Sequence, residues 1–178
     1  MRIISGNYKG KTLHPGKNFS ARPTTDFAKE ALFNILANRF DFQDVEVLDL
    51  FSGTGSIGYE FASRACISVD VVELNYKHAG FIQSTAKELK FSQLKVHRIS
   101  AFQYIKTCSS TFDIIFADPP YDMEKVDQIP TLILDRRLLK PAGVLILEHS
   151  KKISFSGHSN LKDHRSYGSV NFSFFENL

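Results

Sequence analysis

The chain has 178 residues, of which 43% are hydrophobic and 23% charged, and its net charge is +3. This composition is typical of a globular protein with its own core, and no window approaches the roughly 18 apolar residues of a membrane span, so a membrane protein is excluded. Because the first 13 residues are polar and basic, unlike a secretory signal, we expect a cytoplasmic protein. We expect one domain over residues 1–178, with residues 1–22 as an extension and residues 23–178 as the core.

The positive charge is concentrated near the N-terminus. Residues 1–40 carry seven Lys and Arg side chains against two acidic ones, whereas residues 41–150 carry 11 against 15 and the remainder four against two. A basic segment of this kind favours a polyanionic partner, although charge alone supports a plain solvated surface equally well.

The first predicted elements precede the main fold. Residues 2–5 and 9–13 flank a glycine turn and predict a small β-hairpin. A cap at Thr24 or Thr25 then predicts a helix to about Arg39, because apolar residues recur there at the spacing of one helical face.

Short β-rich runs then alternate with helical patterns. The predicted strands lie near residues 46–50, 67–73, 94–99, 112–117 and 143–148. This alternation predicts an α/β fold with a doubly wound, mostly parallel sheet and helices on both faces. Two final strand-like runs, 164–167 and 170–176, are joined by a Gly-Ser turn and predict an antiparallel C-terminal hairpin.

A glycine-rich loop at residues 49–58 follows the first strand, and ligands of such sheets bind beyond the carboxyl ends of the strands. The absence of Lys-Ser/Thr after the glycines excludes a P-loop and leaves a dinucleotide or a nucleoside cofactor. A carboxylate at Asp49 would repel a pyrophosphate but favours the ammonium and sulfonium of S-adenosylmethionine (AdoMet). We therefore predict AdoMet, held by Asp49, Phe51, Gly53 and Gly55.

Two further strand ends supply candidate cofactor contacts. Glu73 ends the second strand, where an acid accepts the ribose hydroxyls of NAD and AdoMet alike, so it does not choose between the two. Ser100 and Ala101 follow the third strand, at a position where they would lie against the adenine ring of the cofactor. For Ser100 a simple helix cap is the alternative.

The segment Asp118-Pro119-Pro120-Tyr121 follows the fourth strand and predicts the catalytic site. The exocyclic amine of a base is a poor nucleophile because its lone pair is delocalised into the ring. The Asp118 carboxylate and the Pro119 carbonyl can each accept one amine N–H, which orients the nitrogen and stabilises its developing charge. The prolines fix the loop, and Tyr121 offers a face on which a base can stack.

Other chemistries fit the sequence less well. Cys66 and Cys108 lie at predicted helix ends away from this sheet edge, so we do not expect the covalent route that methylation at pyrimidine C5 requires. The six histidines show no metal-ligand spacing, and we predict no metal.

These segments resemble the RsmD-like family of 16S rRNA guanine-N2 methyltransferases over nearly the whole chain. The segments similar to the family's opening and to its cofactor and catalytic motifs are 2–6, 10–13, 22–26, 30–34, 49–58 and 118–121. The resemblance implies a seven-stranded Rossmann-like AdoMet methyltransferase that acts on 16S rRNA in the small ribosomal subunit or an assembly intermediate. Phe27 stands where the family usually has a basic residue, and Asn75 and Ser100 replace more usual acidic or Asn residues.

The leading hypothesis is a monomeric guanine-N2 methyltransferase whose Arg2, Lys9, Lys11 and Arg22 contact RNA phosphates. Three alternatives remain open. The same segment at residues 118–121 suits adenine N6 amines and protein glutamine amides. An NAD-dependent oxidoreductase uses the same kind of sheet, and a non-catalytic RNA-binding factor could retain the fold.

Overall fold

The structure is a computed structural model that describes residues 1–16 and 25–177. The elements in chain order are α1 (Asp26–Ala37), η1 (Phe42–Asp44), β1 (Glu46–Leu50), α2 (Ser56–Ser63), β2 (Ser68–Val72), α3 (Tyr76–Glu88), β3 (Leu94–His97), α4 (Ala101–Thr107), β4 (Phe112–Ala117), η2 (Val126–Gln128), α5 (Ile129–Asp135), β5 (Leu139–His149), β6 (Leu161–Tyr167) and β7 (Val170–Phe175).

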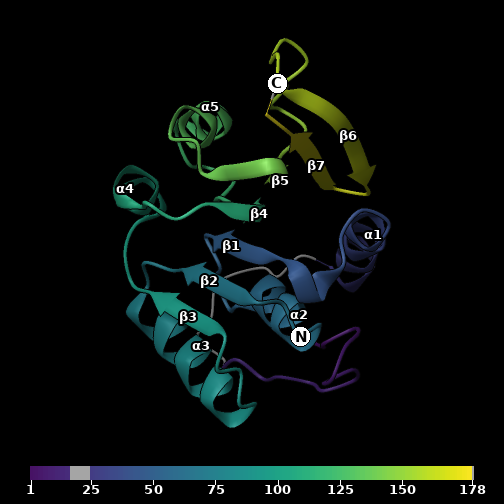
Figure 1. Cartoon of the computed structure of the whole chain (residues 1–178), viewed down its shortest axis with the longest axis vertical. Helices are drawn as coiled ribbons and strands as arrows, with labels where there is room; N and C mark the ends of the chain where they lie inside the picture. Colours follow the sequence, from purple (N-terminus) through teal and green to yellow (C-terminus); the bar gives the residue numbers. More distant parts are fainter. Residues whose placement is uncertain (17–24, 178) are drawn as a thin grey trace.

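One seven-stranded sheet, in the order β3-β2-β1-β4-β5-β7-β6, forms the centre of the described fold (Figure 1). β1 to β5 pair in parallel, whereas β7 runs antiparallel to β5 and to β6. The predicted doubly wound sheet and C-terminal hairpin are therefore confirmed. Sequence order reverses between β1 and β4, and in such sheets that reversal marks the place where ligands bind.

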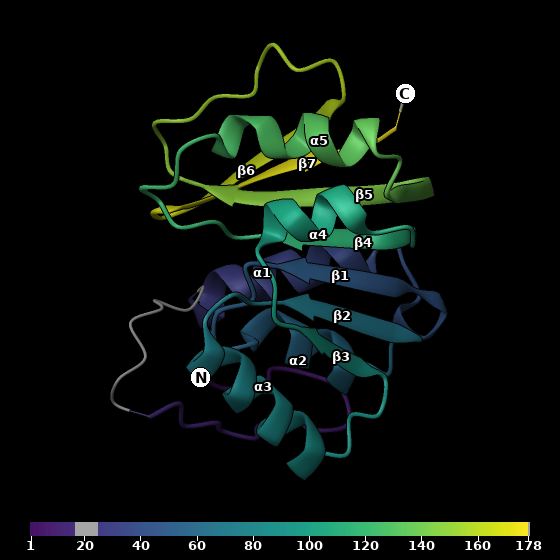
Figure 2. The same ribbon diagram turned by 90° about the vertical axis from the view of Figure 1, so that its left-hand side faces the viewer.

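The helices cover both faces of the sheet, as Figures 1 and 2 show. Helices α1, α2 and α3 contribute to one apolar cluster, and α4 and α5 to the other. The central strands β1 and β4 are almost wholly buried because both of their faces are covered. Edge strand β6 is mostly exposed, and its sequence is accordingly polar.

β5 is longer than the sequence predicts. We expected it near residues 143–148, but it begins at Leu139, which pairs with Phe112. The register then shifts before Ile114 pairs with Val144, so an irregular stretch joins the two parts of the strand. The irregularity includes Ala142 at a positive φ of 62°, and the turn-like Pro-Ala-Gly sequence there concealed the strand.

The N-terminal hairpin forms with little regular strand. Arg2 and Thr12 make a single antiparallel bridge, and backbone hydrogen bonds join Ile3 to Lys11 and Leu13 to Met1. Ile3 and Leu13 are buried against the α1–α3 face of the sheet. The hairpin is thus anchored by apolar side chains and by hydrogen bonds to α2, such as that from the Ile4 N–H to Glu60, rather than by a long ladder of its own.

Helix α1 begins at the predicted cap. The Thr25 side chain accepts the Ala28 N–H at 3.2 Å, and Asp26 opens the helix, which ends at Ala37. Thr24, the other predicted cap, and Arg22, a predicted RNA contact, lie outside the described residues. In the part of the chain that the structure describes, no helix combines the length and apolarity needed to cross a bilayer.

Candidate active site

A cavity of about 530 Å³ opens at the carboxyl edge of the sheet. The loops after β1, β2, β3 and β4 line it, together with Glu148 of β5, Thr25 before α1 and the turn between β6 and β7. The predicted site residues among its lining are Asp49, Phe51, Gly53, Glu73, Ser100, Ala101, Asp118, Pro119, Pro120 and Tyr121. Residues chosen from four separate strand ends therefore meet in one cavity.

Gly55 does not belong to that lining, and the geometry gives it a different place. It is the N-cap of α2 at a φ of 81°, where a Cβ atom would lie 2.9 Å from Cζ of Tyr59. The loop before it also bends back sharply, with Phe51 at a φ of 60° and Gly53 at 55°. Gly55 thus allows the sharp turn from the loop into α2, where a residue with a side chain would be strained. A direct contact between Gly55 and the cofactor stays a prediction.

Asp49 lies beneath this loop and is 1% exposed. Its Oδ2 accepts the Gly58 N–H at 3.1 Å, which fixes the carboxylate toward the start of α2. Burial raises the pKa of Asp49 to about 7, and the nearby Glu73 carboxylate adds to the shift, against the hydrogen bonds from Ser52 and Gly58. A cation in the cavity would stabilise the ionised form of Asp49.

Glu73 braces the loop from the end of β2. Its Oε2 accepts the Gly53 N–H and its Oε1 accepts the Asn75 N–H, each at 2.7 Å. Asn75 in turn caps α3, since its side chain accepts the backbone N–H groups of Lys77 and His78. The Glu73 carboxylate is therefore held in place at the cavity wall, where its remaining lone pairs can accept hydroxyl groups.

Ser100 serves as the helix cap that the sequence offered as an alternative. Its side chain accepts the Gln103 N–H at 3.2 Å at the start of α4. The residue also lines the cavity, next to Ala101 and Phe102. Capping thus accounts for the Ser100 hydroxyl, and its contact with an adenine ring stays a prediction.

The segment 118–121 directly follows β4 and lines the cavity. The Asp118 N–H donates to the Leu50 carbonyl at 3.4 Å, and the Pro120 carbonyl accepts the Met123 N–H at 2.9 Å. Pro119 is buried, whereas the Tyr121 side chain is 55% exposed at the rim. A rigid turn therefore presents Asp118 inward and an aromatic ring outward.

Glu148 is a further acid at this site that the sequence analysis missed. It lies near the end of β5, is 3% exposed and lines the cavity with Asp118. Burial raises the pKa of Asp118 well above its usual value, and the charges of Glu148 and Asp49 raise it further. Glu148 is the last residue of the predicted strand 143–148, as Glu73 is of the second predicted strand, so the carboxyl ends of the predicted strands were a signal for it as well.

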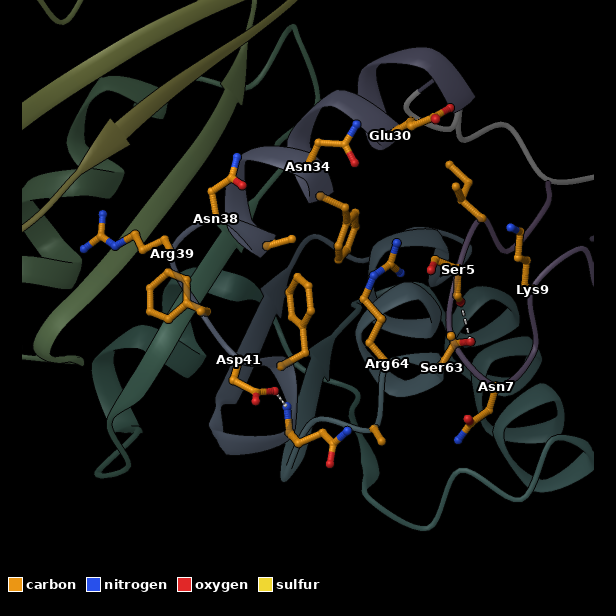
Figure 3. Close-up of a pocket in the computed structure, with 18 residues that line it drawn as sticks. Ser5, Asn7, Lys9, Glu30, Asn34, Asn38, Arg39, Asp41, Ser63 and Arg64 are labelled. Carbon is orange, nitrogen blue, oxygen red and sulfur yellow. Dashed lines mark hydrogen bonds between the residues drawn. The ribbon is translucent and has the colours of Figure 1, made fainter.

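The described basic residues of the predicted RNA-binding set lie on the N-terminal segment, outside this cavity. Arg2 forms an ion pair with Asp26 at 3.5 Å, and Lys11 pairs with Glu88 at 3.2 Å. Lys9 borders a second, open cavity of about 950 Å³ between the hairpin and α1. Figure 3 shows this cavity, with polar side chains from the hairpin, α1 and α2 around it.

The cysteines lie away from the cavity, as expected. Cys66 is buried, and its burial raises the pKa of the thiol to about 12. Cys108 is the C-cap residue of α4. Over residues 1–16 and 25–177, no cluster of three or more His, Cys, Asp or Glu side chains is arranged to hold a metal ion.

The topology and the cavity at its switch point define the Rossmann-like fold of class I methyltransferases, as predicted. The chain belongs to the family described as conserved hypothetical protein 95, whose model matches residues 1–176. Members of that family named ribosomal RNA small subunit methyltransferase D confirm the predicted RsmD-like resemblance.

Two of these relatives cover most of the chain. The protein of that name from Haemophilus influenzae is 33% identical over 155 residues, which span 85% of this chain and 79% of that protein. The one from Buchnera aphidicola subsp. Baizongia pistaciae is 29% identical over 182 residues, which span 100% of this chain and 92% of that protein. The solved structure of Escherichia coli YhhF superposes with a TM-score of 0.85 at 26% identity and covers 98% of this chain and 96% of that one.

Proposed function

We propose that the chain transfers the methyl group of AdoMet to the exocyclic N2 amine of a guanine in small-subunit ribosomal RNA. The observation that carries this proposal is that Asp118 to Tyr121 and the Asp49 loop line the same cavity. The names of the relatives support ribosomal RNA as the substrate class. We further propose that the enzyme works as a monomer in the cytoplasm, on the small subunit or an assembly intermediate.

The cofactor half of the cavity suits AdoMet, which supplies a methyl group activated by a positively charged sulfur. Asp49 and Glu73 place two carboxylates against the loop that would receive the cofactor. The Asp49 charge complements an ammonium or sulfonium, and Glu73 can accept ribose hydroxyls. The same Asp49 charge opposes the pyrophosphate of NAD, so the residues fit AdoMet better than a dinucleotide.

The substrate half contains the groups that act on the amine. In its ionised form Asp118 accepts one N–H of the base, and the Pro119 carbonyl accepts the other, so the nitrogen lone pair is directed toward the methyl donor. As the nitrogen becomes positive, the carboxylates of Asp118, Glu148 and Asp49 stabilise it. Asp118 is the group in contact with the departing amine proton, and the open rim at Tyr121 allows that proton to reach solvent.

The test is methylation of unmodified small subunits, naked 16S rRNA, DNA and protein with labelled AdoMet, followed by mass spectrometry of the nucleosides. We expect N2-methylguanosine from small-subunit rRNA. Label on adenine N6 or on glutamine would overturn the base assignment, and tight binding of NAD instead of AdoMet would overturn the cofactor.

The variant Asp118→Ala tests the role of Asp118 in the same methylation assay. Because Asp118 contacts the amine under attack, the substitution should lower kcat by about 100-fold or more and change the Kd for AdoMet little. Equal losses in turnover and cofactor affinity would show that Asp118 supports the cavity and does not act on the amine. Turnover in the parent protein that disappears in the variant also excludes a non-catalytic RNA-binding factor.

A further inference from the structure

An exposed aromatic side chain stands beside the substrate half of the cavity. Phe27, in the first turn of α1, is 70% exposed. Its ring lies 6.0 Å from that of Tyr167, the last residue of β6, at an interplanar angle of 75°. An apolar ring in this position buries little of its own surface, so its contribution to folding is small.

The ring pair is supported from the core. The ring of Tyr167 also packs against that of Phe172, with 6.0 Å between the ring centroids, and the centroids of Phe172 and Phe116 are 6.3 Å apart. Phe172 is fully buried in β7, and Phe116 lines the active-site cavity from β4. A continuous series of ring contacts therefore fixes Tyr167 in place and leaves Phe27 presented to solvent.

The position of the pair follows from the sheet order. Thr25 at the start of α1, with Ser169 and Val170 after β6, lines the cavity on the side of β4 and β5, which carry Asp118 and Glu148. The cofactor-side residues Glu73 and Ser100 follow β2 and β3, across β1. Figure 1 shows α1 beside the β6–β7 hairpin, and the Phe27–Tyr167 ring contact joins these two elements close to Thr25 and Ser169, which line the cavity.

We propose that Phe27 and Tyr167 form a stacking ledge for an unpaired RNA base next to the target guanine. This proposal rests on the proposed function and adds a positioning site to it. A base drawn into the cavity leaves its neighbour without a stacking partner, and an aromatic face replaces that partner with little dependence on sequence. The Arg2 guanidinium, which pairs with Asp26 in the same turn of α1 and is 58% exposed, lies where it can meet the adjoining phosphate.

The chain contains no tryptophan, so Phe27→Trp places a single fluorescent reporter on the ledge. With S-adenosylhomocysteine present, we expect unmodified 16S rRNA and a single-stranded oligoribonucleotide to quench this tryptophan, and the matching duplex to quench it far less. The control variant is Ile67→Trp. Ile67 is 56% exposed and directly precedes β2, at the amino end of the strands and so away from the cavity at their carboxyl ends. A tryptophan there should show no quenching.

Kinetics provide the second readout. Phe27→Ala and Phe27→Leu should raise the KM for rRNA about tenfold, while kcat and the Kd for AdoMet stay within twofold. Phe27→Trp and Phe27→Tyr should keep the parent KM, because the aromatic face is retained. Ile67→Ala should match the parent in all three quantities.

The outcomes separate this proposal from the proposed function. If the parent methylates rRNA while Phe27→Ala keeps its KM and Phe27→Trp is not quenched, the ledge is wrong and the activity stands. If the parent methylates no rRNA, the proposed function itself fails. Equal quenching of Phe27→Trp by single-stranded and duplex RNA would overturn an unpaired base as the occupant.

Discussion

At the scale of single residues, the cavity concentrates negative charge where positive charge must be bound. Asp49, Asp118 and Glu148 all line it, and the pKa values of Asp49 and Asp118 are raised by burial. Without a cation, the folded protein bears the cost of these buried carboxylates near neutral pH. Binding of a cationic cofactor would offset part of that cost, so stability and ligand affinity should respond to pH in opposite directions.

The variant Asp49→Asn tests whether stability and AdoMet affinity respond to pH in opposite directions. The folded pKa of about 7 lies above the usual value of 3.8, so Asp49 favours the folded state at low pH and this advantage is lost as pH rises toward 7. The cofactor-free variant should therefore have a higher Tm than the parent at pH 8 and bind AdoMet at least about tenfold more weakly. Calorimetry at pH 6 and 8 should also show that the parent gains AdoMet affinity with pH and the variant gains little. The same gain in both proteins would exclude Asp49 as the titrating group.

Glu148 supplies a second prediction at this scale. Its charge raises the pKa of Asp118, and Asp118 must be ionised to accept the amine N–H strongly. The kcat of the parent should consequently fall as pH drops through the raised pKa of Asp118. Glu148→Gln removes the neighbouring charge and should move this fall to lower pH. A pH profile of kcat measures the shift, and an unmoved profile would separate Glu148 from the titration of Asp118.

At the scale of elements, one buried cation joins three parts of the chain. Lys29 in α1 is 1% exposed, and its Nζ donates to the Arg2 carbonyl at 2.7 Å and to the Ser56 hydroxyl at 3.2 Å. It also pairs with Glu60 of α2 at 3.1 Å, and Glu60 accepts the Ile4 N–H. Since Ser56 opens α2 and lines the cavity, this network connects the N-terminal hairpin through α1 to the glycine-rich loop after β1.

Lys29→Met should be strongly destabilising because it leaves Glu60 buried with one cation fewer. We expect a loss of about 3 kcal/mol in the free energy of unfolding, measured by urea denaturation. The matched control is Lys11→Met, which breaks the exposed pair with Glu88 and should cost less than about 1 kcal/mol. Similar costs for both variants would mean that the buried network contributes little.

The elements that the sequence predicts well are those whose pattern is local. Alternating strands and helices, the loop after β1 and the segment 118–121 each have a short signature, and all lie where the pattern places them. Lys29 and Glu60 could not be paired in advance, because 31 positions separate them in the sequence and only packing of α1 on α2 joins them. The start of β5 was missed for the opposite reason, since its local sequence indicates a turn while pairing with β4 imposes a strand.

At the scale of the whole molecule, the charge is divided between two regions. The carboxylates gather in the cavity, whereas residues 1–40 carry most of the surplus of basic side chains. A polyanion is therefore repelled by the cavity as a whole and attracted by the N-terminal segment. This arrangement favours binding of the RNA backbone to the N-terminal segment, outside the cavity, and entry of only an uncharged base into the cavity.

Neutralising that segment should change how RNA binding depends on salt. Lys9→Ala with Lys11→Ala removes two exposed cations from the hairpin, and the slope of log K against log salt should fall by about 1 to 2. The control Lys106→Ala with Lys162→Ala removes the same charge from α4 and β6, away from the hairpin, and should leave the slope close to that of the parent. AdoMet affinity should stay the same in both, because neither pair lines the cavity. Equal slopes for the two double variants would mean that net charge, and not the hairpin, determines RNA affinity.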